Sequence, residues 1–258
     1  MGNTLDAQYG PAFYEGQAEG SARSAAIVVP LILSRMSVSS VVDVGCGIGT
    51  WAAAFLSNSI ADVIGIDGDY VQTSMLKIPR ERFIARDLRA PIALNRRFDL
   101  AVCLEVAEHL PETRSAGLVE DLTNLAPCVL FSAALPGQGG TNHINERFLS
   151  YWAEQFASKD FLPADLIRPQ VWSNDAVEPW YRQNAMIFAA AGHPILNEGS
   201  RSANVYIHPA IYAKHAFKPP LTIGQLLGEF PGAIQRSFAA RTRNMSGRKS
   251  PVALSRGR

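Results

Sequence analysis

The chain has 258 residues, of which 47% are hydrophobic and 18% charged, and its formal net charge is +1. This composition is typical of a globular protein with a large core and excludes an intrinsically disordered chain. A charge balance so close to zero gives no general attraction for nucleic acid. The longest early apolar run, residues 25–33, is too short to span a bilayer, and the three cysteines lack metal-ligand spacing. We therefore expect a reduced, cytoplasmic protein.

Short apolar runs alternate with helical patterns in the first half of the chain. Helices are expected over residues 21–36, 50–57 and 116–125. Strands bounded by turn residues are expected between and after them, over residues 41–45, 63–67, 83–88, 99–106 and 128–135. Such runs are typical of buried parallel strands, and their alternation with helices predicts a doubly wound sheet.

The pattern changes after residue 140. An amphipathic helix is expected over residues 143–161, with Phe148, Trp152 and Phe156 on one face. Two more strands, 163–169 and 184–191, flank a polar and aromatic loop. The sequence therefore predicts a Rossmann-like α/β fold, with a doubly wound, mostly parallel seven-stranded sheet and helices on both faces.

A glycine-rich turn follows the first expected strand, in the run VVDVGCGIGTW of residues 41–51. Gly45, Gly47 and Gly49 let a ligand approach the backbone, and the helix that follows directs its N-terminal amides toward the ligand. The G-x-G-x-G spacing differs from the pattern that binds dinucleotides, which disfavours an NAD-dependent oxidoreductase. Asp43 lies inside the apolar strand and needs a partner, for which the amino group of a zwitterionic ligand is suitable.

Two further acidic residues end the next two expected strands. Asp67, in VIGID, is placed to accept hydrogen bonds from both hydroxyls of a ribose. Asp87, in FIARDL, is placed to meet the amino group of an adenine. Acids at the ends of three successive strands predict a nucleoside site.

The runs VDVGCGIGTW, GIDGD, RDL and FDLAVCLEVAEHLPE together resemble the class I S-adenosylmethionine-dependent methyltransferases. The resemblance covers about residues 40–135 and extends more loosely to residue 190. It implies S-adenosylmethionine as the cofactor, with the glycine turn beside its methionine part, Asp67 at the ribose, and Asp87 and Leu88 at the adenine. The full set of expected cofactor-binding residues is Asp43, Gly45, Cys46, Gly47, Gly49, Asp67, Gly68, Asp87, Leu88 and Glu105.

This resemblance divides the chain into three parts. Residues 1–36 are expected to form a lid and helix over the cofactor, to which Tyr9, Phe13 and Tyr14 are suited. Residues 37–195 are expected to be the cofactor-binding domain. Residues 196–258 are expected to be an extension with a helix over 223–243 and a basic, disordered tail, which offers weak contact with a membrane surface.

The candidates for catalysis are His109, His143 and Glu108. Glu105 and His109 are four residues apart, a spacing that puts both on one face of a helix. A histidine can act as a general base that the carboxylates orient. Alternatively, Glu105, Glu108, His109 and His143 bind a divalent cation, an option that we do not favour, or the acids only stabilise a helix start.

The methyl acceptor is expected to be a hydroxyl group of a small molecule or glycan. The aromatic and polar side chains of residues 172–184 are suited to a sugar ring. HINERF and WYRQNAMIF resemble bacterial methyltransferases of glycan and secondary-metabolite genes, whereas E-x-x-E-H is similar to small-RNA 2′-O-methyltransferases. RNA is the less expected acceptor because the catalytic region lacks a field of basic residues. A non-catalytic cofactor-binding protein is the third alternative.

Overall fold

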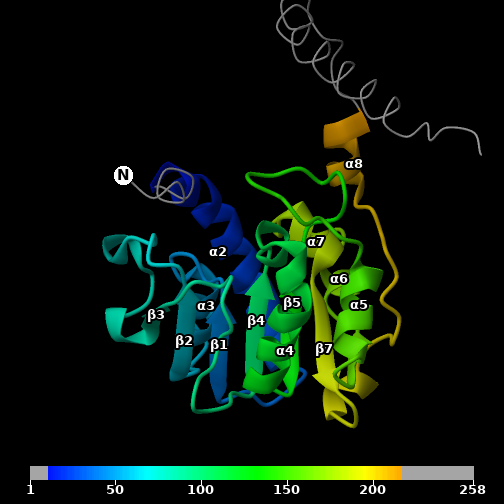
Figure 1. The fold of residues 1–258 in the computed structure, drawn as a ribbon. Coiled ribbons are helices and arrows are strands. Elements are labelled where there is room, and N and C mark those ends of the chain that lie inside the picture. Colours follow the sequence, from blue (N-terminus) through cyan, green and yellow to red (C-terminus); the bar gives the residue numbers. More distant parts are fainter. Residues whose placement is uncertain (1–10, 217–258) are drawn as a thin grey trace, which may run out of the picture. The chain divides into compact units, whose positions relative to one another are not determined.

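The computed structural model describes residues 11–216, and its central feature is a seven-stranded sheet with the strand order β3-β2-β1-β4-β5-β7-β6 (Figure 1). Strand β7 runs antiparallel to both of its neighbours, and the other pairs are parallel. The predicted mostly parallel, doubly wound sheet is therefore confirmed. The strands are β1 (Ser40–Val44), β2 (Asp62–Asp67), β3 (Phe83–Ala85), β4 (Leu100–Leu104), β5 (Cys128–Ser132), β6 (Phe161–Ala164) and β7 (Met186–Ala190).

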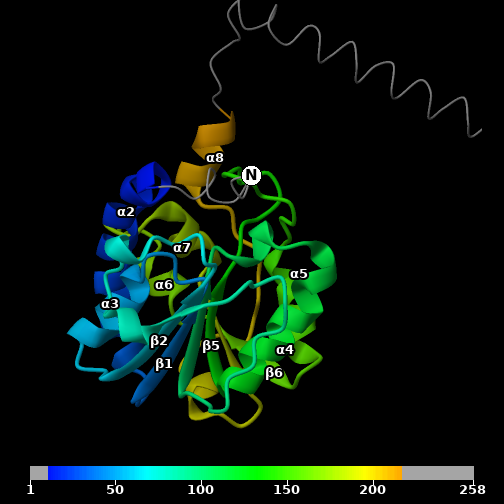
Figure 2. The ribbon, with the colours of Figure 1, turned by 60° about the vertical axis from the view of Figure 1, so that its left-hand side comes forward.

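Helices cover both faces of this sheet, as Figure 2 shows. Successive residues of β4 point to opposite faces, so that Leu100 and Val102 pack with α2 and α3, whereas Ala101 and Cys103 pack with α4 and α5. The helices are α2 (Pro11–Leu33), α3 (Thr50–Ser57), α4 (Ser115–Leu125), α5 (Leu149–Ala157), α6 (Arg168–Val171), α7 (Pro179–Asn184) and α8 (Pro209–Ala216). None of the helices in the described part of the chain is long and apolar enough to cross a membrane.

The strand order has a topological switch point at β1 and β4. Strand β1 pairs with β2 on one side and with β4 on the other, so the chain winds in opposite directions from this point. In open α/β sheets ligands bind at such a switch point. The loops that follow β1 and β4 carry the glycine turn and the residues from Glu105 to His109, so the fold brings these two segments together.

The expected helix over residues 143–161 is wrong in its first two turns, because α5 begins only at Leu149. The backbone N–H groups of Ile144 and Asn145 donate to the carbonyl of Glu108, at 2.9 and 3.0 Å, and hold this irregular stretch against the turn after β4. Phe148 precedes the helix and is 48% exposed, whereas Trp152 and Phe156 are buried as expected.

Two other local predictions need correction. The strand expected over residues 163–169 is β6, which ends at Ala164, and Pro169 lies in the first turn of α6, where a missing N–H has no cost. The loop expected over 172–183 contains part of α7. The first helix begins at Pro11 rather than at residue 21.

Some predictions lie outside the described residues. They concern Tyr9, the helix over 223–243 and the basic tail. By contrast, the helix predicted over residues 50–57 is confirmed as α3, and the helix predicted over 116–125 is α4, which begins one residue earlier.

Candidate active site

The glycine turn connects β1 to α3 through backbone conformations that glycine adopts freely. Gly45 has φ +78° and Gly49, the residue before α3, has φ +83°. A Cβ atom on Gly45 would lie 2.2 Å from Val106 in the loop after β4. The turn therefore packs directly against that loop, and Gly47, with φ +53°, and Cys46, which is buried, lie between these two glycines.

Asp43 is buried in β1 with 3% of its surface exposed. Its Oδ2 atom accepts a hydrogen bond from the backbone N–H of Ala52 in α3, at 3.2 Å. Burial, with a smaller contribution from Asp67, raises the pKa of the Asp43 carboxyl to about 7. The partner of Asp43 in this structure is thus the first turn of α3.

Asp67 ends β2 and is also buried, at 4% exposure. Its Oδ2 accepts from the N–H of Gly47 at 2.6 Å, and its Oδ1 accepts from the N–H of Gly68, also at 2.6 Å. The hydroxyl of Tyr70 donates to the same Oδ1. Burial raises the pKa of Asp67, and these three hydrogen bonds oppose that rise. The carboxylate links the glycine turn to the loop after β2.

Asp87 lies apart from these buried acids. Strand β3 ends at Ala85, so Asp87 comes two residues beyond the strand, and its exposed carboxylate pairs with Arg89 at 2.8 Å. The hydrogen bond from Arg89 lowers the pKa of Asp87. Leu88 is buried, and its carbonyl accepts from Arg114 at 2.9 Å.

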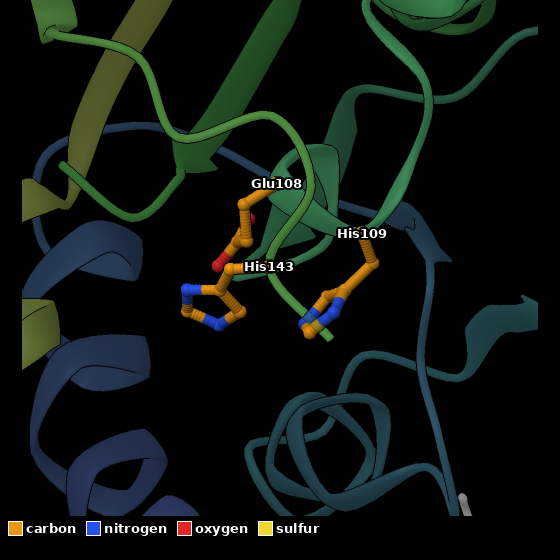
Figure 3. A group of neighbouring side chains, drawn as sticks. All are labelled: Glu108, His109 and His143. Carbon is orange, nitrogen blue, oxygen red and sulfur yellow. The ribbon is translucent and has the colours of Figure 1, made fainter. Parts of the chain in front are cut away.

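Glu108, His109 and His143 form a cluster at the carboxyl edge of the sheet (Figure 3). Ligand-type atoms of the three side chains lie within 4.8 Å of one another, and the two imidazole rings meet edge to face at 4.9 Å. Two segments build the cluster: the 3₁₀ turn Ala107–His109 after β4, and the loop after β5. The expectation of one helix carrying Glu105 and His109 is wrong, because Glu105 has φ +54° and the turn comprises only three residues.

The charges of this cluster follow from its burial. Glu108 is completely buried, neither of its carboxylate oxygens meets a partner of good hydrogen-bonding geometry, and burial, with a contribution from Glu105, raises its pKa well above the usual value. Burial and the neighbouring His143 lower the pKa of His109 to about 4, so that imidazole is neutral at pH 7. The cluster therefore offers a neutral imidazole at His109 beside a buried carboxyl group that holds its proton more tightly than usual.

His143 is held by a carboxylate of its own. Its Nδ1 atom lies 2.9 Å from Oε1 of Glu146. Glu146 also accepts from the N–H groups of Gly137 and Gly139, at 2.7 and 3.2 Å, and so fixes the loop that carries the histidine. Burial alone would raise the pKa of Glu146, but these hydrogen bonds together lower it.

Glu105 adjoins the cluster electrostatically, since it affects the pKa of Glu108, and it has hydrogen-bond partners of its own. The carboxamides of Gln138 and Asn184 donate to its two oxygens, at 3.0 and 3.3 Å. Burial raises the pKa of Glu105, and hydrogen bonds from Ser132, Asn184 and Gln138 act against that rise. Sequence reasoning missed Gln138, whose only signal was an amide side chain inside the turn PGQGG.

The aromatic and polar residues expected to form one sugar-binding loop are distributed over several places. Tyr181 joins α7 to α3, because its hydroxyl accepts from Nε1 of Trp51 at 3.3 Å. Trp172 and Tyr206 line a cavity of about 270 Å³. Of this set, Asn184 alone makes a hydrogen bond to Glu105 in the described part of the chain.

Comparison of the sequence with protein-family models identifies a family. Residues 18–161, more than half of the chain, match the family model described as a methyltransferase domain. No curated protein matches the sequence.

Solved structures are similar at low identity. The sugar N-methyltransferase KedS8 from Streptoalloteichus is 16% identical with a TM-score of 0.55, over 74% of this chain and 94% of that one. Magnesium protoporphyrin IX methyltransferase from Synechocystis, with bound S-adenosylmethionine, is 17% identical with a TM-score of 0.47, over 67% of this chain and 80% of that one. The methyltransferase domain of bacterial CtHen1 is 18% identical with a TM-score of 0.48, over 65% of this chain and 98% of that one.

At these identities the structural likeness shows the fold alone, and the family follows from the match of the sequence to the family model. The sequence matches the family model, and the mostly parallel sheet carries the glycine turn at its switch point. The chain therefore belongs to the class I S-adenosylmethionine-dependent methyltransferases.

Proposed function

We propose that this enzyme transfers the methyl group of S-adenosylmethionine to a hydroxyl group of a small molecule or sugar. The observation that carries the proposal is the cluster of Glu108, His109 and His143 in the loops that follow β4 and β5. An oxygen acceptor must lose a proton during the reaction, and this cluster provides groups that can receive it or weaken its bond.

The transfer is an in-line displacement. The acceptor oxygen attacks the methyl carbon while the carbon–sulfur bond breaks, and both electrons of that bond go to sulfur to give S-adenosylhomocysteine. The hydroxyl proton goes to the imidazole of His143. Glu146 contacts Nδ1 of this ring, which leaves Nε2 as the nitrogen that accepts the proton, in the manner of a base oriented by a carboxylate.

A divalent cation is the second way to activate the hydroxyl, and the donor set fits one. The carboxyl group of Glu108 is completely buried, and one of its oxygens and a nitrogen of each imidazole lie within 4.8 Å of one another. Imidazole and carboxylate together suit transition-metal ions. Glu108, His109 and His143 would hold the ion, which would lower the pKa of a hydroxyl bound to it.

Exposed apolar side chains in the segment that follows His143 are consistent with an acceptor that has an apolar face. Ile144 follows His143 directly and is 65% exposed, and Phe148 in the same loop is 48% exposed. Side chains of this kind suit the face of a sugar ring or an aromatic ring. RNA is the alternative acceptor, to be included in the test below.

The proposal is tested with methyl-labelled S-adenosylmethionine and panels of sugars, phenols, amines and a short RNA. We expect label in a phenol or sugar, and mass spectrometry of the product should place the methyl group on oxygen. His143→Ala should lower kcat by about 100-fold or more, because a positioned base contributes at least that much. Label on nitrogen, or an unchanged rate in His143→Ala, would contradict the proposal, and label on RNA alone would favour the alternative acceptor.

The matched control is His193→Ala. Ala189 in β7 pairs with Cys128 at the start of β5, so His193, just beyond β7, lies at the opposite edge of the sheet from the cluster. This variant should keep the wild-type rate.

The cation is tested separately by titrating the protein with Co²⁺ and recording its visible absorption. A cation site predicts a ligand-field spectrum that is lost in His109→Ala and kept in His193→Ala, together with loss of methyl transfer in a chelator. An activity that the chelator does not change would leave His143 as the base.

A further inference from the structure

Three sequence segments meet at Glu105, the first residue after β4. Its backbone N–H donates to the carbonyl and to the hydroxyl of Ser132, at 3.0 and 3.1 Å, so the end of β5 fixes the start of this loop. Its side chain receives Gln138 from the loop after β5 and Asn184 from the end of α7. Glu105 therefore joins segments that are far apart in the chain.

Each oxygen of Glu105 has its own amide donor. Nε2 of Gln138 lies 3.0 Å from Oε2, and Nδ2 of Asn184 lies 3.3 Å from Oε1. Gln138 is 7% exposed and Asn184 is 2% exposed. Amide groups that are buried to this degree must find partners, and hydrogen bonds to a charged acceptor are stronger than those to a neutral one.

A backbone group fixes which way these amides face. The N–H of His208, which can only donate, points at Oε1 of Gln183 at 2.8 Å. The NH₂ group of Gln183 is thereby turned toward the amide oxygens of Gln138 and Asn184, both at 3.1 Å. With their oxygens engaged in this way, both amides present their NH₂ groups to Glu105.

The position of Glu105 determines what its carboxylate meets. It lies at the switch point between β1 and β4, where ligands of such sheets bind, and Val106 beside it packs against Gly45 of the glycine turn. On its other side begins the turn that carries Glu108 and His109. Glu105 thus stands in the chain between a residue that packs on the glycine turn and the turn that carries two members of the cluster.

We propose that Gln138 and Asn184 are positioning residues that hold the Glu105 carboxylate toward the sulfonium group of S-adenosylmethionine. The inference rests on the expected role of Glu105 at the cofactor and does not depend on the identity of the acceptor. It has a specific consequence. The substrate cofactor carries a positive sulfur and the product S-adenosylhomocysteine does not, so Glu105 attracts the first and not the second.

The test compares the dissociation constants of S-adenosylmethionine and S-adenosylhomocysteine by calorimetric titration. In Gln138→Met and in Asn184→Ala, binding of S-adenosylmethionine should weaken by about tenfold, the range for a hydrogen bond to a charged group. Binding of S-adenosylhomocysteine should stay within about twofold, because a neutral sulfur gains little from the carboxylate. A loss of packing would weaken both ligands equally, and that result would overturn the inference.

A matched control and a double variant complete the design. Gln170 is an exposed glutamine in α6, outside the network, and Gln170→Met should change neither constant. Glu105→Gln should reduce the preference for S-adenosylmethionine as Gln138→Met does, and the double variant should reduce it no further, because both act through one carboxylate. Additive losses would contradict a positioning role.

Failure of this inference can be told apart from failure of the proposed function. Equal losses for both ligands would remove the role of the amides and leave hydroxyl methylation intact. Methylation of nitrogen would overturn the proposed function and leave the preference for the sulfonium unchanged.

Discussion

The carboxylate of Asp67 accepts three hydrogen bonds from neighbouring residues of the protein itself. Gly47 and Gly68 donate backbone N–H groups to it, and Tyr70 donates its hydroxyl to Oδ1. A Cβ atom on Gly68 would lie 2.0 Å from the Tyr70 ring, so the ring packs over that glycine. If Asp67 accepts the ribose hydroxyls, as its place at the end of β2 predicts, the Tyr70 hydroxyl competes with them.

At the residue scale we therefore expect Tyr70→Phe to bind S-adenosylmethionine more tightly. The ribose no longer displaces a hydrogen bond to a carboxylate, which contributes about 1.5 kcal/mol or more, so the dissociation constant should fall by about tenfold. Calorimetric titration measures the change, with Tyr151→Phe on α5 as the control. Weaker binding in Tyr70→Phe would mean that the hydroxyl itself contacts the cofactor.

Helix α5 buries Trp152 and Phe156 as predicted but starts later than predicted. The ring of Phe156 stacks on Phe188 of β7 at 4.1 Å, with an angle of 7° between the ring planes. Phe131 of β5 meets Phe156 edge to face at 5.3 Å. The helix is therefore attached to the sheet through Trp152, which meets Phe131 at 5.2 Å, and through Phe156, while the residues before Leu149 belong to the loop that holds His143.

At the element scale, this arrangement predicts unequal effects for two phenylalanines of the expected stripe. Phe156→Ala should lower the free energy of unfolding by about 3–5 kcal/mol, as for other buried phenylalanines. Phe148→Ala should lower it by less than about 1 kcal/mol, because Phe148 is 48% exposed. Urea unfolding of both variants measures the difference. Equal losses would mean that Phe148 belongs to the core.

The molecule as a whole keeps two acidic side chains, Asp43 in β1 and Asp67 at the end of β2, buried. Burial raises the pKa of both, and that of Asp43 moves from 3.8 to about 7. The folded state therefore holds the Asp43 proton over a pH range in which the unfolded chain has released it. The contribution of this proton to the free energy of unfolding is largest below pH 3.8, and it is lost as the pH rises toward about 7.

At the scale of the whole molecule we expect the ligand-free protein to lose stability between pH 5 and about pH 7, by about 1.4 kcal/mol per pH unit from this group. Asp43→Asn keeps an oxygen that can accept from Ala52 but carries no charge. This variant should be more stable than the wild type at pH 8 and depend less on pH. Urea unfolding at pH 5 and pH 8 tests this, and equal pH dependence in both proteins would contradict it.

The sequence by itself determined the sheet, the glycine turn and the family, because these depend on local patterns. Apolar runs of strand length and glycines at fixed spacing act within a few residues, and so they can be recognised without the fold. His109 and His143 could be named as candidates for the same reason: each stands in a short polar run next to an expected strand or helix.

Only the tertiary structure decided how these residues are combined. Hydrogen bonds from Ile144 and Asn145 to the Glu108 carbonyl bring His143 to the cluster, and α5 begins only after this segment. No local pattern encodes a contact across 36 residues of chain. The amides that donate to Glu105 come from the loop after β5 and from the end of α7, and their orientation depends on the backbone N–H of His208. Buried polar groups must find partners wherever the chain provides them, so their pairing is a property of the packed molecule.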